Sequence, residues 1–372
     1  YRVDTNQQYS AEILSILLQS ENKLHRPLVD TKPKYIPKDT DTLSGVDVLL
    51  QCLAWYRRKD PQDSQEEEYM ESLFGSLCSL LCGKVPKRAF VEAEGVELIV
   101  RMIRERRLAR PRAFKVLSYA LTPIELVADD PSDDGGGGES GSIEAEISER
   151  FINGQGLDPL FAAFMKKGAR ELSKWFKGYS ESEEEEHVVS CLSLLFQFTD
   201  PGTPLRWRIL SKFVDLDSAN AKEGTTKAAR PSKGRARLDR LLELHAQLKD
   251  RVDTVDEQIE LLPEEVQPWL DSEERYFERL NAGLSTLQMV DVCIANILLE
   301  DREAEEHIRR VLTRRGQPMD TVRSILRDFV MTLLAESEQP RASDGSDSEA
   351  GARIPASARR RIDNLQLAIA AL

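Results

Sequence analysis

The side chains best able to bind a metal or act as nucleophiles are few and scattered. The chain has 372 residues, four histidines and five cysteines. Cys78 and Cys82 lie four residues apart on a predicted helix without a histidine or second cysteine pair nearby, so no zinc site is predicted. The odd number of cysteines, most of them on apolar stripes, indicates buried free thiols in a reducing compartment. The residues in question are His25, His187, His245, His307, Cys52, Cys78, Cys82, Cys191 and Cys293.

Nothing in the sequence argues for an enzyme. There is no P-loop, no G-x-G-x-x-G after a strand, no G-x-S-x-G and no H-E-x-x-H. The carboxylates occur in runs, and none forms an acid–base pair in an apolar setting. His245 lies on an apolar helical stripe, as expected of a packed core histidine, whereas His187 is expected to be exposed. We therefore predict no catalytic residue, no cofactor and no metal; an enzymatic function would need a polar cleft that the sequence does not display.

Acidic residues are the main candidates for recognition. The formal net charge is −13, which disfavours direct nucleic-acid binding and suits basic protein segments. Four acids open one predicted helix, either as a solvated first turn favoured by the helix dipole or as a dock for a basic peptide. The basic run from Arg104 to Arg112 also has two interpretations. Its cations suit the C-terminal end of a helix, or they contact a phosphate or an acidic partner. The candidate acids are Glu67, Glu71, Glu183, Glu184, Glu185 and Glu186.

The elements that must position these side chains are helices. Aromatic residues make up only 6% of the chain, while Leu, Ala, Glu and Arg are abundant, which favours helix. No sustained strand-like alternation occurs, and no apolar run approaches the roughly 18 residues that span a bilayer. The sequence starts at Tyr1 without a methionine and is expected to be a fragment of a longer protein.

Three predicted helices share one pattern. After Gly45, Gly95 and Gly156, apolar residues occupy offsets +1, +4, +5 and +8, and an acid occupies offset +2. We interpret them as an internal helical repeat with steps of roughly 50 to 60 residues, in which glycine permits a sharp turn into each helix. The alternative is three ordinary amphipathic helices that each follow a glycine.

Composition shifts suggest the domain organisation. Residues 1–215 are expected to form repeats interrupted by a flexible insert at about 129–142, followed by a flexible basic linker at 216–237. Residues 238–335 are expected to form further helical repeats or a cap, including one long helix over 273–300. A disordered linker at 336–354 then leads to an amphipathic helix at 355–372. Its stripe, Ile362, Leu365 and Ile369, is expected to dock on the body or on a partner.

The order of short helix, glycine-led helix and long amphipathic helix resembles the armadillo repeat, with Lys87–Ala93, Gly95–Arg104 and Arg112–Leu121 as its three helices. Collinear segments also resemble the beta-catenin-like family of nuclear armadillo proteins, over the C-terminal two thirds or so of such a protein. The segments include Tyr9–Gln19, Gly45–Gln51, Tyr69–Ser79, Leu117–Ala120, Glu185–Val188, Arg240–His245 and Tyr276–Leu284.

The resemblance implies a nuclear adaptor of the pre-mRNA splicing machinery. Its partners would include a Myb-domain splicing factor resembling the cell-division-cycle-5 protein, bound through basic, nuclear-localisation-like segments. The Trp-x-x-x-Asn ladder of importin-type armadillo grooves is missing, because Phe74 with Cys78 and Leu194 with Phe198 stand in the corresponding helices. Any basic segment must therefore be held differently.

The sequence thus predicts an all-α, right-handed armadillo/HEAT-type solenoid with a C-terminal helical cap. The expected function is a non-enzymatic nuclear scaffold that binds basic segments through the six candidate acids. The alternative is a structural solenoid that docks through apolar surface, as a homo-oligomer or a spacer, with Ile362, Leu365 and Ile369 as candidate contacts. No membrane association is expected.

Overall fold

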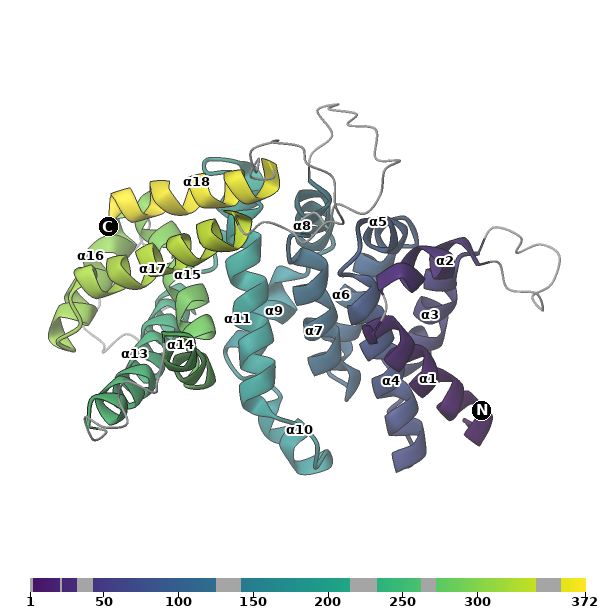
Figure 1. The fold of residues 1–372 in the computed structure, drawn as a ribbon. Coiled ribbons are helices and arrows are strands. Elements are labelled where there is room, and N and C mark those ends of the chain that lie inside the picture. Colours follow the sequence, from purple (N-terminus) through teal and green to yellow (C-terminus); the bar gives the residue numbers. More distant parts are fainter. Residues whose placement is uncertain are drawn as a thin grey trace, which may run out of the picture. The chain divides into compact units, whose positions relative to one another are not determined.

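The structure is a computed structural model, and it describes residues 3–20, 22–31, 43–124, 142–214, 233–261, 272–338 and 356–372. Within these ranges the regular structure is helical and no strand occurs. The chain packs as two compact units, Tyr1–Phe198 and Thr199–Leu372. The all-α solenoid expected from the sequence is confirmed (Figure 1).

The first unit is built from three-helix repeats. The long third helices form one layer in which α1 packs against α4, α4 against α7, and α7 against α11. Each glycine-led second helix contacts the third helix of its own repeat or of the next one, as α6 contacts α7 and α9 contacts α11. The helices are α1 Thr5–Ser20, α2 His25–Asp30, α3 Gly45–Ala54, α4 Ser64–Leu80, α5 Lys84–Glu92, α6 Gly95–Glu105, α7 Ala109–Leu121, α8 Ile143–Asn153, α9 Leu157–Phe164, α10 Ala169–Trp175 and α11 Glu181–Gln197.

The repeat pattern is confirmed, because all four apolar offsets are buried in α3, α6 and α9. The glycines, however, serve close packing rather than a turn. A Cβ on Gly95 would lie 2.3 Å from the ring of Phe90, and one on Gly156 would lie 2.4 Å from the ring of Phe151. The left-handed residues are instead their predecessors, Glu94 with φ 56° and Gln155 with φ 62°. Each glycine thus makes room for the short helix before it.

Local capping explains where α3 and α4 begin. The Ser44 hydroxyl accepts a hydrogen bond from the Asp47 amide, and the Asp47 carboxylate accepts one from the Ser44 amide, which is a complete capping box. The acid at offset +2 of the first copy is therefore a capping residue. Asp63 caps α4 by accepting from the Glu66 amide at 2.9 Å.

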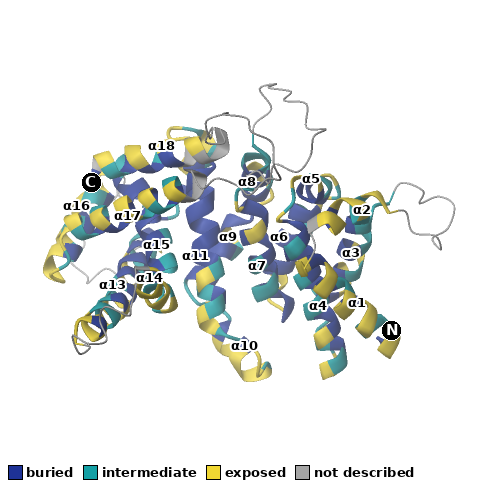
Figure 2. Ribbon diagram, in the orientation of Figure 1, coloured by how far each residue is buried: buried dark blue, intermediate teal, exposed yellow. Residues whose placement is uncertain are grey.

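The second unit is organised around α15, whose residues are buried along most of its length (Figure 2). This helix contacts α13, α14, α16, α17 and α18. The helices are α12 Pro204–Leu210, α13 Lys233–Glu260, α14 Ser272–Asn281, α15 Leu284–Glu300, α16 Arg302–Arg314, α17 Met319–Glu338 and α18 Ala356–Ala371.

Two predicted boundaries in this unit were wrong. The helix expected over 273–300 is broken into α14 and α15 by Gly283, whose φ of +103° lies outside the helical region. The helix α13 begins at Lys233, so the last five residues of the linker expected at 216–237 are helical. Lysine, arginine and alanine are good helix formers, and they extend the helix that buries Leu238 and Leu241.

Several expectations fall outside the described residues: most of the insert at 129–142, the linker at 216–232 and the linker at 339–354. On either side of the insert, Lys87 Nζ donates to the carbonyl of Thr122 at 2.5 Å and to Glu144 Oε1 at 3.0 Å. The lysine side chain is fully buried. This single ammonium group therefore ties α5 to the end of α7 and the start of α8.

Among the described residues, no group of three or more His, Cys, Asp or Glu side chains is arranged to hold a metal ion. No single described helix has both the length and the apolarity needed to cross a membrane; α14 and α15 reach that threshold only as a pair, and they are bent by 71°.

Candidate protein-binding site

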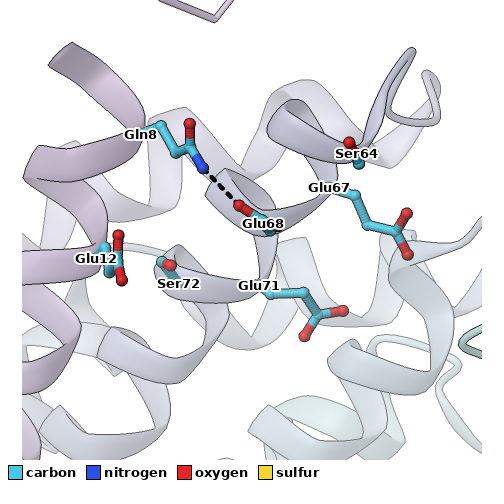
Figure 3. A pocket seen from close by; sticks show the side chains of 7 residues that line it. All are labelled: Gln8, Glu12, Ser64, Glu67, Glu68, Glu71 and Ser72. Carbon is cyan, nitrogen blue, oxygen red and sulfur yellow. Dashed lines mark hydrogen bonds between the residues drawn. The ribbon is translucent and has the colours of Figure 1, made fainter. Parts of the chain in front are cut away.

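The first unit carries an acidic cleft lined by residues of α1 and α4. In Figure 3, Gln8, Glu12, Glu68 and Ser72 lie where the two helices face each other, whereas Glu67 and Glu71 extend from the side of α4 that faces away from α1. Its volume is about 440 Å³. Four glutamates and three neutral polar residues line it, and no basic side chain does. The lining residues are Gln8 and Glu12 of α1, and Ser64, Glu67, Glu68, Glu71 and Ser72 of α4. The cleft therefore suits a cationic ligand.

The four glutamates of the cleft are not equivalent. Glu68 accepts a hydrogen bond from Gln8 Nε2 at 2.5 Å, which joins the two walls. Glu71 pairs with Arg112. Within the described residues, Glu12 and Glu67 have no ion-pair partner. These two carboxylates are therefore available to an incoming lysine or arginine.

Arg112 at the start of α7 bridges the acids of its two neighbouring helices. Its Nε lies 2.7 Å from Glu71 of α4, and its Nη1 lies 2.7 Å from Glu183 of α11. Burial disfavours the charged guanidinium, but the hydrogen bonds and charges of the two carboxylates outweigh it, so the pKa of Arg112 is raised. Glu71 and Glu183 are thus already paired within the chain.

Glu184 forms a buried pair with the neighbouring arginine, Arg110. The Nε and Nη2 atoms of Arg110 each donate to a Glu184 carboxylate oxygen at 2.7 Å, and both side chains are at least 95% buried. The hydroxyl of Tyr179 donates to the same carboxylate at 2.7 Å. Burial and this acceptor raise the pKa of Tyr179. Glu184 is therefore a structural residue, not a surface contact.

The remaining two predicted acids differ from each other. Glu185 lies 3.4 Å from Lys166 Nζ, an ammonium group that also pairs with Glu181. Glu186 is exposed and has no ion-pair partner among the described residues. Among the described residues, only Glu67 and Glu186 of the six predicted acids therefore remain without an ion-pair partner, and Glu12, which was not predicted, joins them.

The basic partners were visible in the sequence but were not connected to the acids. Arg110 and Arg112 belong to the basic run expected either at a helix end or against an acidic partner; the acidic partner is the chain itself. The sequence feature that could have revealed the pairing is the charge of the first helical turns. Acidic residues stand in the first turns of α4 and α11, and arginines stand in the first turn of α7, which lies between them. Because third helices of successive repeats lie side by side, alternating charge at their first turns predicts such pairing.

The expectation of an exposed His187 was wrong. The ring is largely buried, with 15% of the side chain exposed, and its Nε2 has no hydrogen-bond partner. Burial and the nearby Lys115 lower the pKa of His187 to about 4, although Glu183 opposes this. The imidazole is therefore neutral at pH 7.

His245 is buried as expected, but it also has a partner that the sequence did not reveal. Its Nδ1 lies 2.6 Å from Asp291 Oδ1, and both side chains are fully buried. Burial opposes the charged imidazole, but Asp291 raises the pKa of His245 overall. The pair links α13 to α15 in the interior of the second unit.

The C-terminal helix docks on its own unit. Ile362 and Leu365 are buried where α18 packs against α17 and α15. These two residues, expected as alternative partner contacts, are therefore core residues of the second unit. Ile369 is only partly buried and lines a cleft of about 660 Å³ with residues of α17.

A different helix carries exposed apolar side chains. Along α1, four large apolar residues at helical spacing are each 45–57% exposed. They are Tyr9, Ile13, Ile16 and Leu17. Within the described residues, one face of α1 therefore leaves a continuous apolar stripe in contact with water.

Comparisons with known proteins agree with this architecture. A family model described as "Catenin-beta-like, Arm-motif containing nuclear" matches residues 1–327. Beta-catenin-like protein 1 of Bos taurus is 30% identical over 361 residues, covering 91% of this chain and 53% of the relative. The Homo sapiens protein of that name is 30% identical over 341 residues, covering 89% of this chain and 51% of the relative.

A more distant relative is similar over the same extent. The beta-catenin-like protein 1 homolog of Schizosaccharomyces pombe is 26% identical over 349 residues, covering 92% of this chain and 50% of that protein. The chain spans about half the length of the curated relatives it matches, which is less than the two thirds expected from the sequence.

Proposed function

The chain belongs to the catenin-beta-like family of Arm-motif containing nuclear proteins, and from this premise we propose that it serves the pre-mRNA splicing machinery. It is a nuclear armadillo-type scaffold, and in this proposal it is non-enzymatic and holds basic, nuclear-localisation-like segments of splicing factors. The partner proposed first is a Myb-domain factor of the cell-division-cycle-5 type. The observation that carries the proposal is the α1–α4 cleft with its two unpaired carboxylates, Glu12 and Glu67.

Binding in this cleft would be polar and distributed over several contacts. An exposed ion pair contributes less than about 1 kcal/mol, so Glu12 and Glu67 alone give only weak affinity. Additional contacts such as Glu186 would add affinity if one ligand segment engages them together. The net charge of −13 raises the local concentration of basic segments and speeds their association.

The mode of binding would differ from that of an importin. Phe74 and Cys78, at the ladder positions of α4, are buried and offer no amide to hold a peptide backbone. Glu71 and Glu183 are occupied by Arg112, so a ligand arginine would have to displace an internal one. We therefore assign recognition to the rim formed by Glu12, Glu67 and Glu68.

The test is a pull-down from nuclear extract with the full chain at low and at high salt, read by mass spectrometry. The proposal predicts splicing factors that are retained at low salt and lost at high salt. Recovery of no splicing factor, or loss of none when Glu12 and Glu67 are changed to glutamine, would contradict it. A chain with Glu149→Gln and Glu303→Gln is the matched control, because both residues are exposed and lie outside the cleft.

The exposed stripe of α1 favours a second candidate function, an apolar docking scaffold that self-associates. In this candidate the occupant is the α1 stripe of a second copy. Ile13→Asp and Ile16→Asp would then convert an oligomer into a monomer in light scattering, with little dependence on salt. A monomeric wild-type chain would exclude this candidate.

A further inference from the structure

The short helix α10 and its flanks form a basic, aromatic protrusion on an acidic protein. We call residues 167–177 the α10 tip; in Figure 2 most of its helix is coloured as exposed. Four cationic residues of the tip are exposed, and Trp175 at the end of the helix is 79% exposed. The cations are Lys167, Arg170, Lys174 and Lys177.

The charges of the tip are not used by the fold. None of the four cations has an ion-pair partner among the described residues, whereas the neighbouring Lys166 is paired with Glu181 and Glu185. Glu171 is the only carboxylate within the tip. Beyond it, Glu67 of α4 lies near the backbone of Gly178, where an added Cβ would be 3.8 Å from Glu67 Oε1. The tip therefore keeps a net positive charge of three.

Trp175 is not used by the fold either. Several phenylalanines of this unit, such as Phe151 and Phe161, are almost fully buried, whereas the indole of Trp175 leaves most of its surface in water. An exposed aromatic face between cations is the arrangement with which proteins hold unpaired bases: the ring stacks on a base while the cations contact the phosphates.

From this arrangement we propose that the α10 tip binds single-stranded nucleic acid, with Trp175 as the stacking platform and the four cations as phosphate contacts. This goes beyond the proposed function, because it concerns another surface and another ligand class. A seven-residue helix is about 10 Å long, which suits a site of only a few nucleotides. A duplex would not offer a free base face, and an acidic peptide would use the charges but not the ring.

The overall charge of −13 limits this binding but does not prevent it. At physiological ionic strength, charges farther away than about 8 Å are largely screened, so the local cations decide the sign of the potential that a strand meets. We expect weak binding that falls steeply with salt, with a slope of about −0.7 in log affinity against log salt for each phosphate neutralised.

The test measures fluorescence anisotropy of a labelled oligouridine of about 12 nucleotides with the full chain. Trp175→Ala should weaken binding about tenfold if one base stacks on the ring. Lys167→Gln with Lys174→Gln, which removes two phosphate contacts, should make the salt slope shallower by about 1.4. The matched controls Trp207→Ala and Arg302→Gln remove an exposed tryptophan and an exposed cation elsewhere, and both should leave the affinity unchanged.

Two competing ligands complete the design: an RNA duplex of the same length and an oligoglutamate peptide. Binding of the single strand that exceeds both, and that depends on Trp175, supports the proposal. Absence of binding at about 50 mM salt overturns it. Equal binding of the duplex, equal or tighter binding of the peptide, or equal losses from the control variants would also overturn it, because the tip would then act as an unspecific or protein-binding surface.

Discussion

Arg110 at the start of α7 holds the carboxylate of Glu184 near the start of α11 through two parallel hydrogen bonds of 2.7 Å, and both side chains are buried. The pair joins two successive third helices of the solenoid. It also removes one acid from the set that the sequence offered for ligand binding. The surface available to a basic partner is therefore smaller than the number of acids suggests.

Removing one member of this pair should destabilise the first unit strongly. Arg110→Met leaves the Glu184 carboxylate buried without its counter-charge, a situation that typically costs about 3–5 kcal/mol. Replacing both residues, as in Arg110→Met with Glu184→Leu, should recover much of the loss. Urea unfolding of the two single variants and the double variant measures the coupling. If the losses simply add, the two side chains do not stabilise each other.

The glycines of the repeat should not tolerate a methyl group. Gly95→Ala places a Cβ about 2.3 Å from the Phe90 ring, and such overpacking typically costs about 1–3 kcal/mol or more. Phe90→Leu in the same chain should relieve part of the loss. Gly178→Ala is the control, because its Cβ would meet only Glu67 Oε1 at 3.8 Å. Equal melting temperatures for Gly95→Ala and Gly178→Ala would contradict the packing role.

His187 should make the stability of the first unit depend on pH. Its pKa is about 4 in the folded chain against an ordinary value of 6.5, so the unfolded chain binds the proton more tightly between these values. The free energy of unfolding should therefore fall as pH drops from 6.5 towards 4, by at most roughly 3 kcal/mol from this residue. His187→Gln should flatten the profile in that window; an unchanged profile would show that other groups produce the dependence.

The C-terminal helix should behave as part of the second unit. Ile362→Asp buries a charge against α15 and α17 and should lower the melting temperature of that unit markedly. Leu367→Asp lies on the same helix, but its side chain is 53% exposed, so it should change the melting temperature little. Hydrogen exchange of the backbone amides of α15 distinguishes the two variants, because only Ile362→Asp should reduce their protection. Equal protection in both variants would mean that α18 does not cover α15.

Local features were largely predictable from the sequence. Periodicity and the shared glycine spacing placed α3, α6 and α9, because burying one face of a helix requires apolar residues every three or four positions. The reason for the glycines was not predictable, since the contact of Gly95 with Phe90 depends on how α5 packs on α6. The break at Gly283 was missed because the apolar pattern continues across it.

The candidate site was less predictable, because it depends on which repeats are neighbours. Glu71, Glu183 and Glu184 look like solvated acids until α7 places Arg110 and Arg112 between α4 and α11. Glu12 was missed because its role depends on α1 packing against α4, over 50 residues away in the chain. Long-range pairing of charges has no local sequence signature, whereas the apolar stripes that bring those charges together do.

Binding of basic segments in the α1–α4 cleft can be measured with a labelled, lysine- and arginine-rich, nuclear-localisation-like peptide. Its affinity for the full chain is determined at several salt concentrations. With Glu12→Gln and Glu67→Gln, binding should weaken about three- to tenfold and its salt dependence should flatten, because each exposed pair contributes less than about 1 kcal/mol. The control pair Glu149→Gln and Glu303→Gln should keep the wild-type affinity. Equal affinities and salt slopes for the wild type, the cleft variant and the control would contradict binding in this cleft.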